Sequence, residues 1–98
     1  MKDLERIKRI LASHKAELQE RFGVRKIGVF GSYARSQNTP GSDVDVIVDL
    51  DGAIGWEIVD LHDYLEQILE LRADLVTTRA AEQKRLLWES IVEDLVYA

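Results

Sequence analysis

The chain has 98 residues, of which 46% are hydrophobic and 32% are charged, and its formal net charge is −5 at pH 7. This length predicts one small domain spanning residues 1–98, without room for a second core. The acidic balance argues against direct nucleic-acid binding, which normally needs a basic face. The absence of cysteine excludes disulfides, thiolate metal sites and thiol nucleophiles.

The N-terminus is charged and helical in pattern, and the sequence has no apolar run of membrane-spanning length. We therefore expect a cytoplasmic protein without membrane contact.

The first part of the chain predicts a helix, a strand and a short helical turn. An amphipathic helix is expected over residues 3–22, because apolar residues recur there every three or four positions. Gly23 follows at a position suited to a left-handed C-cap. The first strand is expected over residues 25–30. Ser32 then stands where a helix N-cap would, which predicts a helical turn over residues 33–36.

The rest of the chain alternates strands and helices. A loop rich in Asn, Thr, Pro, Gly and Ser is expected before the second strand. The remaining elements are expected as a strand, a helix, a strand and a helix, over residues 43–49, 56–71, 74–77 and 79–94. Three strands covered by helices predict a small α/β layer structure.

Two carboxylates stand at i and i+2 at the second expected strand. Because side chains alternate faces along a strand, Asp43 and Asp45 point the same way, while the valines beside them point into the core. Mg²⁺ prefers one or two carboxylates together with phosphate oxygens and water. Two such ions can clamp the attacking and leaving oxygens of an in-line displacement at phosphorus. The alternative is a pair of solvated acids on an exposed strand face.

A Gly31-Ser32 pair ends the first strand, ten residues before the acids. Glycine permits the close approach of a phosphate, and serine adds a hydroxyl donor without bulk. Gly-Ser turns are common, so this signal is weak alone, and Ser32 is also interpreted as a helix cap. Arg35 either neutralises phosphate or braces the acidic loop through an ion pair.

A third carboxylate begins the third expected strand. Asp74 is flanked by apolar residues, where an acid is poorly placed for a purely structural role. If this strand lies next to the second one, Asp74 faces the acid pair. There it would orient a metal or act as the general base that activates an attacking hydroxyl. The alternatives are a strand-start acid and a salt-bridge partner.

Other polar and aromatic residues have simpler interpretations. His14 and His62 are interpreted as structural, because neither has a partner spaced for metal ligation. Trp56 and Trp88 are interpreted as core or interface anchors.

The chain resembles the minimal nucleotidyltransferase (MNT) branch of the DNA polymerase β-like nucleotidyltransferase superfamily. The motifs that carry the resemblance are Phe30-Gly-Ser-Tyr-Ala-Arg35, Ser42-Asp-Val-Asp45 and Asp74-Leu-Val-Thr77. The likeness extends over nearly the whole chain. One departure is Ser36, where the family usually has glycine, and it leaves the acids untouched.

The resemblance implies the small nucleotidyltransferase fold of the α/β (α+β) class, with a three-stranded mixed sheet and about four helices. It implies that Asp43, Asp45 and Asp74 are catalytic acids and metal ligands, with Mg²⁺ as cofactor in two ions. It also implies that Gly31 and Ser32 hold the triphosphate of ATP.

Members of this branch are typically encoded beside a HEPN-domain protein, as the antitoxin of a type VII toxin–antitoxin pair. The family activity is transfer of AMP from ATP to a tyrosine of the toxin, which silences its RNase activity. The resemblance therefore implies a hetero-oligomer with a HEPN toxin. Two alternatives stay open, an antitoxin that neutralises the toxin by binding alone and a nucleotidyltransferase with a small-molecule acceptor.

Overall fold

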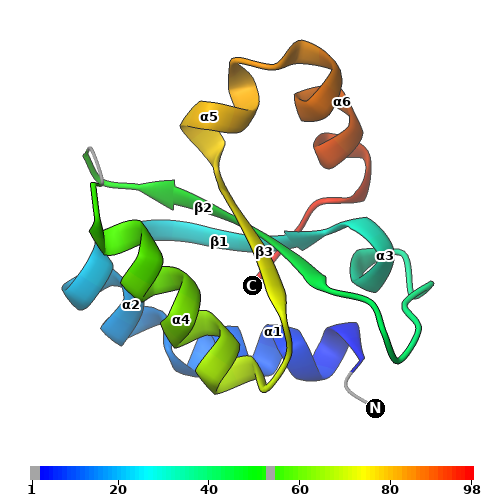
Figure 1. Cartoon of the computed structure of the whole chain (residues 1–98), viewed down its shortest axis with the longest axis horizontal. Coiled ribbons are helices and arrows are strands. Elements are labelled where there is room, and N and C mark those ends of the chain that lie inside the picture. The colour runs from blue at the N-terminus through cyan, green and yellow to red at the C-terminus, as the bar shows by residue number, and fades with distance from the viewer. Residues whose placement is uncertain (1–2, 53–54) are drawn as a thin grey trace.

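The computed structural model describes residues 3–52 and 55–98. A mixed sheet with the strand order β3-β2-β1-β4 forms its middle layer (Figure 1). The strand β1 (Val24–Phe30) pairs antiparallel with β2 (Val44–Leu50) and with β4 (Val96–Tyr97). The strand β3 (Ala73–Thr77) runs parallel to β2. The expected fold class and mixed sheet are thus confirmed.

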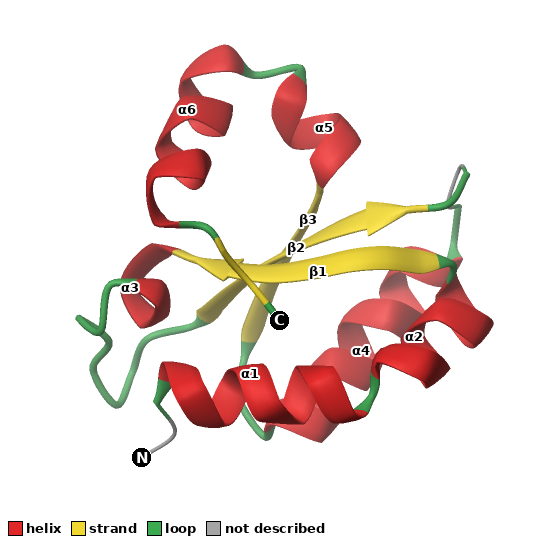
Figure 2. Ribbon diagram, turned by 180° about the vertical axis from the view of Figure 1, so that it is seen from behind, coloured by secondary structure: helices red, strands yellow, loops and turns green. Residues whose placement is uncertain are grey.

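Helices cover both faces of the sheet. Those in the described residues are α1 (Leu4–Ser13), α2 (Lys15–Phe22), α3 (Gly31–Ala34), α4 (Glu57–Leu69), α5 (Thr78–Glu82) and α6 (Arg85–Asp94). Figures 1 and 2 show α1, α2 and α4 on one face, α5 and α6 on the other, and α3 at one end of β1. Among the described residues, no helix combines the length and apolarity that crossing a bilayer requires.

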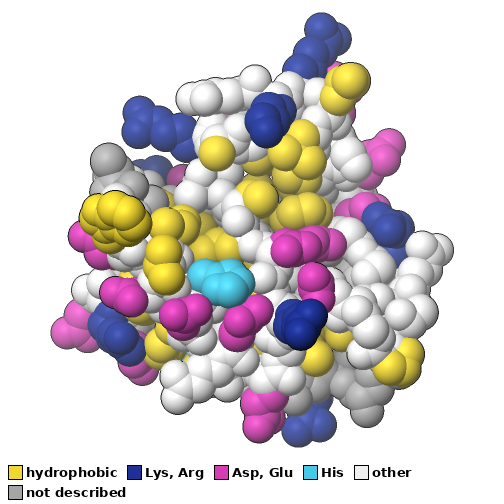
Figure 3. Space-filling view, viewed as in Figure 1, with side chains coloured by type: hydrophobic (Ala, Val, Ile, Leu, Met, Phe, Trp, Pro, Cys, Tyr) yellow, Lys and Arg dark blue, Asp and Glu magenta, His cyan; other side chains and the backbone are white. Residues whose placement is uncertain are grey.

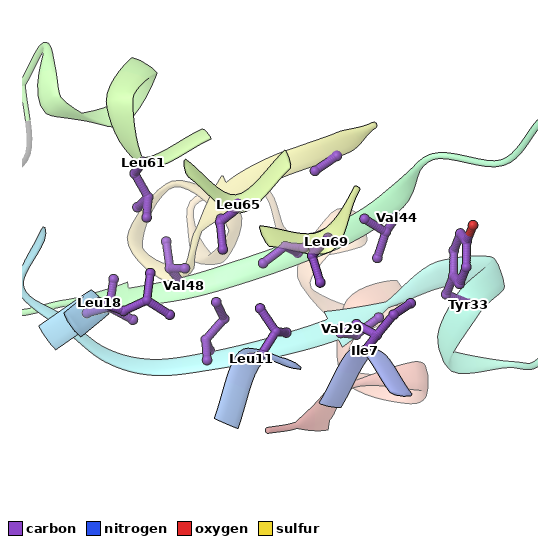
Figure 4. Packing of buried hydrophobic residues seen from close by; sticks show 14 residues of the cluster. Ile7, Leu11, Leu18, Val29, Tyr33, Val44, Val48, Leu61, Leu65 and Leu69 are labelled. Atoms are coloured by element: carbon purple, nitrogen blue, oxygen red, sulfur yellow. The ribbon is translucent and has the colours of Figure 1, made fainter. Parts of the chain in front are cut away.

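The main core lies between the sheet and the face that carries α1, α2 and α4. Val44, Val46 and Val48 of β2 are fully buried there, as the strand pattern predicts. Figure 4 shows the leucines of α4 packed against this strand, and these residues are Leu61, Leu65 and Leu69. Because side chains alternate along β2, its acidic residues are left on the opposite face.

A smaller apolar cluster lies on that opposite face. Ile47 of β2 packs there with Ala81 of α5 and Ile91 of α6. This cluster holds the C-terminal helices against the same sheet face that carries Asp45.

The N-terminal helix is interrupted, so the prediction of one helix over residues 3–22 is wrong. Asp3 caps α1 by accepting a hydrogen bond from the Arg6 N–H at 3.0 Å. At His14 the backbone leaves the helical conformation, and the ring Nδ1–H donates to the Ile10 carbonyl at 2.8 Å. The apolar stripe continues across the break, which is why the sequence pattern does not reveal it. Gly23 ends α2 with a left-handed φ of 69°, as expected.

The C-terminal part also differs from the prediction. The expected helix over residues 79–94 is two helices, because Lys84 adopts an extended backbone between them. The sheet has a fourth strand, β4, where three strands were expected. A Cβ at Gly28 of β1 would lie 2.7 Å from Leu95 Cδ1 and 3.1 Å from the Val96 carbonyl oxygen. Glycine at this position therefore makes room for β4.

Candidate active site

Three aspartates gather at the end of the sheet where β2 and β3 begin. Asp45 is the second residue of β2, and its partner in the parallel register is Asp74 of β3. Asp43 immediately precedes β2. On its other side Asp45 is paired with Phe30 of β1, the residue before the Gly31 turn. The register of three neighbouring strands therefore brings together the predicted acids and the predicted phosphate loop.

The surroundings of Asp45 perturb its carboxyl group. The pKa of Asp45 is raised from its ordinary 3.8 to about 6. Burial is the largest cause, the nearby charges of Asp74 and Asp43 add to it, and the positive charge of Arg35 opposes it. A carboxyl group with so high a pKa is held in an environment that disfavours its ionised form. A bound cation would reverse this preference, because it stabilises negative charge on all the carboxylates.

The acids are accessible from outside. Asp43 and Asp74 are exposed, and Asp45 is partly buried between its neighbouring strands. Figure 3 shows acidic side chains gathered in the middle of one face, over the region that β2 and β3 occupy in Figure 1. A polyphosphate can therefore approach this end of the sheet directly from solvent.

Gly31 allows the loop after β1 to lie against the acids. Its φ of 73° is in the left-handed region that favours glycine. A Cβ at this position would also collide with the Oδ2 atom of Asp45. The residue is thus constrained both by its backbone conformation and by the adjacent carboxylate.

The expected capping role of Ser32 is not observed. The helix α3 begins at Gly31, Phe30 occupies the N-cap position, and no side chain caps this helix. The N-cap prediction is therefore wrong, because the strand passes directly into the helix one residue earlier than expected. Ser32 is the second residue of α3 and is partly buried.

Arg35 braces the loop to the C-terminal region. Its Nη1 atom donates to Asp94 Oδ2 of α6 at 2.5 Å, and its Nε–H donates to Gln37 Oε1 at 3.1 Å. This arrangement corresponds to the bracing alternative. The guanidinium nevertheless lies close enough to Asp45 to lower the pKa of that carboxyl.

Comparison with known proteins decides the family. The nucleotidyltransferase domain family matches residues 11–98. The chain belongs to this family. Over 98 residues it is 44% identical to the protein adenylyltransferase MntA of Thermococcus cleftensis, with 99% of this chain and 97% of the relative covered. The chain is therefore a nucleotidyltransferase.

Solved structures share the nucleotidyltransferase fold. One chain of a toxin–antitoxin crystal structure with AMP-PNP matches with a TM-score of 0.70 and 23% identity, over 87% of this chain and 69% of that one. A chain from the complex of tri-AMPylated Shewanella oneidensis HEPN toxin with MNT antitoxin matches with a TM-score of 0.66 and 20% identity, over 93% and 70%. At these identities the likeness shows the fold.

Of two open grooves that border β3 in the described structure, the larger is not lined by the acids. An open groove of about 580 Å³ lies at the other end of β2, where Arg25, Asp49 and Thr77 contribute to its lining. A smaller groove of about 340 Å³ between α4 and β3 includes Asp74. The clustered acids, of which Asp45 has a raised pKa, are the candidate catalytic residues, because a perturbed carboxyl among like charges is typical of active sites.

One cluster beside the acids was missed by sequence reasoning. Ligand atoms of His62, Asp63 and Glu66 lie within 4.8 Å of one another, so the statement that His62 has no suitably spaced partner is wrong. The signal was present as the i, i+4 spacing of His62 and Glu66 on α4. Both side chains bind the backbone of Ala73, next to Asp74.

Proposed function

We propose that this nucleotidyltransferase transfers AMP from ATP to a tyrosine of a cognate HEPN RNase toxin, and so acts as a type VII antitoxin. The observation that carries the proposal is the register of Asp45 with Asp74, beside Asp43 and the Gly31 turn. A protein acceptor is supported by the name of the Thermococcus cleftensis relative and by the complex in which an MNT antitoxin is bound to a tri-AMPylated HEPN toxin.

The carboxylates fit a divalent cation. Burial and two neighbouring acids raise the proton affinity of Asp45, so the ionised cluster is costly unless positive charge compensates for it. Mg²⁺ is the cation that such oxygen donors and a nucleotide triphosphate share most often. Asp43, Asp45 and Asp74 would hold two Mg²⁺ ions. When bound, these ions would neutralise charge on the phosphates.

The chain's own residues then have distinct roles in the transfer. Asp74 takes the proton of the acceptor tyrosine hydroxyl. The hydroxyl oxygen forms a bond to the α-phosphorus, and the bond from this phosphorus to the oxygen that bridges the α- and β-phosphorus atoms of ATP breaks. Pyrophosphate leaves with the electron pair. Gly31 permits a close approach of the triphosphate, and the Ser32 hydroxyl donates a hydrogen bond to a phosphate oxygen. Arg35 contributes positive charge beside the site.

The test is incubation of the chain with α-labelled ATP, Mg²⁺ and the cognate toxin, followed by mass spectrometry of the toxin. We expect AMP on a tyrosine, and loss of labelling in Asp43→Ala and in Asp45→Ala. Asp49→Ala is the matched control, because Asp49 lies on the same strand but pairs with Arg25 at the far end. Unchanged labelling in both site variants would refute the proposal.

Neutralisation by binding alone is the second candidate, and exposed apolar side chains favour it. Trp56 is 90% exposed and Leu86 is 81% exposed, as is typical of contact residues. In this case the Asp43→Ala/Asp45→Ala double variant still protects cells from the toxin. A labelled product that is not protein would instead indicate a small-molecule acceptor.

A further inference from the structure

The backbone of Ala73 faces the open edge of the sheet. In the strand order, β3 is outermost and has β2 as its neighbour. The carbonyl of Arg72 accepts the Val44 N–H of β2 at 2.9 Å. Because successive peptide groups of a strand point to opposite sides, the N–H and carbonyl of Ala73 point away from β2. Without other partners, these groups would be an unpaired edge.

Two side chains of α4 occupy the place of a neighbouring strand. The Nε2–H of His62 donates to the Ala73 carbonyl at 2.8 Å, and the Ala73 N–H donates to Glu66 Oε2 at 2.8 Å. The two side-chain atoms are 3.4 Å apart, and their residues are one helical turn apart. Both hydrogen bonds are partly buried. We call this arrangement of His62, Glu66 and Ala73 the edge clamp.

The edge clamp acts on the residue before Asp74. The side chain of Ala73 is 5% exposed and belongs to the main core, on the α4 side of the sheet. The next side chain along the strand must therefore point to the opposite face, where Asp45 lies. With its side chain in the core and both backbone groups bound, Ala73 leaves little freedom for the start of β3. Because Asp74 is the next residue, its position is restricted as well.

We propose that His62 and Glu66 are positioning residues, which hold Asp74 beside Asp45 by binding the backbone of Ala73. The inference rests on the proposed function and assigns a role within it to two residues that bind the backbone next to Asp74. It also accounts for the His62 and Glu66 cluster without an ion, because their ligand atoms already bind Ala73.

The test compares variants that remove the edge clamp with variants that keep it. Glu66→Leu and His62→Leu remove the acceptor and the donor, whereas Glu66→Gln and His62→Gln retain them. Gln67→Leu places the same new side chain at an exposed position of the same helix and is the matched control. We expect kcat for AMP transfer to fall roughly 10–100-fold in the two clamp-removing variants, as for residues that orient metal ligands. The KM for ATP should stay within about twofold of wild type in all these variants, because neither His62 nor Glu66 is assigned a nucleotide contact. The kcat of both Gln variants and of the control should also stay within about twofold, because these three changes keep both clamp bonds.

A second measurement does not depend on AMP transfer. Amide hydrogen exchange at Ala73 should be about tenfold faster in Glu66→Leu than in Glu66→Gln, because one hydrogen bond is lost. Paramagnetic Mn²⁺ should broaden the NMR signals of Asp74 in wild type, and this effect should weaken in both Leu variants.

Normal kcat in the Leu variants, equal losses in the Gln and Leu variants, or unchanged Mn²⁺ broadening would each overturn the inference. If wild type transfers no AMP, the proposed function fails, and the exchange and broadening results still decide the role of the edge clamp. Should one Leu variant fail to fold, the other provides the same comparison.

Discussion

At Asp45 the ionised carboxylate that the proposed metal site needs is unfavourable for the stability of the metal-free fold. The carboxyl is partly buried and stands between two other acids, and its pKa is raised to about 6. Between its ordinary value of 3.8 and about 6, the folded state binds more protons at this site than the unfolded state. The contribution of Asp45 to stability is therefore present below this window and is lost as the pH rises through it.

Asp45→Asn should accordingly stabilise the metal-free protein at pH 7.5, because the amide removes a buried negative charge. The difference in Tm from wild type should shrink as the pH falls toward 4. Thermal unfolding in EDTA between pH 4 and 8 measures this effect. A difference that is constant over the whole range would show that charge at Asp45 is not its cause.

Mg²⁺ should raise the Tm of wild type more at pH 7.5 than at pH 5, because protons compete with the cation for Asp45. In Asp45→Asn the Mg²⁺ effect should be small at both pH values. Titration of Mg²⁺ in the same unfolding assay tests this prediction. An equal Mg²⁺ effect in both proteins would place the cation elsewhere.

Gly31→Ala should destabilise the protein by about 1 kcal/mol or more, because alanine disfavours the left-handed φ and its Cβ meets Asp45. Chemical denaturation measures the free energy of unfolding. Gly41→Ala is the control, since a Cβ there has no neighbour within 4 Å in the described structure. Equal effects of the two substitutions would contradict the argument.

At the scale of elements, the acid pair was predictable because its spacing matches the two-residue period of a strand. The position of Asp74 was predictable only conditionally. It depends on β3 lying parallel to β2, which a strand-helix-strand connection favours but does not by itself establish. Once the strands are neighbours, the register places Asp74 opposite Asp45.

Other elements could not be predicted from local pattern. The two residues of β4 become a strand only because β1 lies beside them. The break at His14 leaves the apolar periodicity intact. The hydrogen bonds of His62 and Glu66 to Ala73 join two elements through tertiary packing, so their residue spacing indicates a shared helix face but not its partner.

Gly28→Val should loosen β4, because its side chain would need the space that Leu95 and Val96 occupy. We expect destabilisation of about 1–3 kcal/mol, the usual cost of overpacking. Faster amide exchange at Val96 and Ala98, with little change in α4, would locate the effect. Uniformly faster exchange throughout the protein would instead indicate global destabilisation.

At the scale of the whole molecule, the exposed apolar side chains are expected to contribute little to folding stability and more to binding of a partner. Because Trp56 is 90% exposed, Trp56→Ala should change the free energy of unfolding by no more than about 0.5 kcal/mol. The same substitution should weaken toxin binding measurably if Trp56 is a contact residue. Titration calorimetry with the toxin tests this, and unchanged affinity would remove Trp56 from the interface.

The outermost position of β3 has a consequence for heat inactivation. Asp45 belongs to β2, an interior strand with neighbours on both sides, and Asp43 immediately precedes it, whereas Asp74 belongs to β3, which has β2 as its one neighbouring strand. Edge strands open locally at lower free energy than the rest of a sheet. On warming, the enzyme should therefore lose turnover several degrees before it loses helix content, while it still retains bound nucleotide.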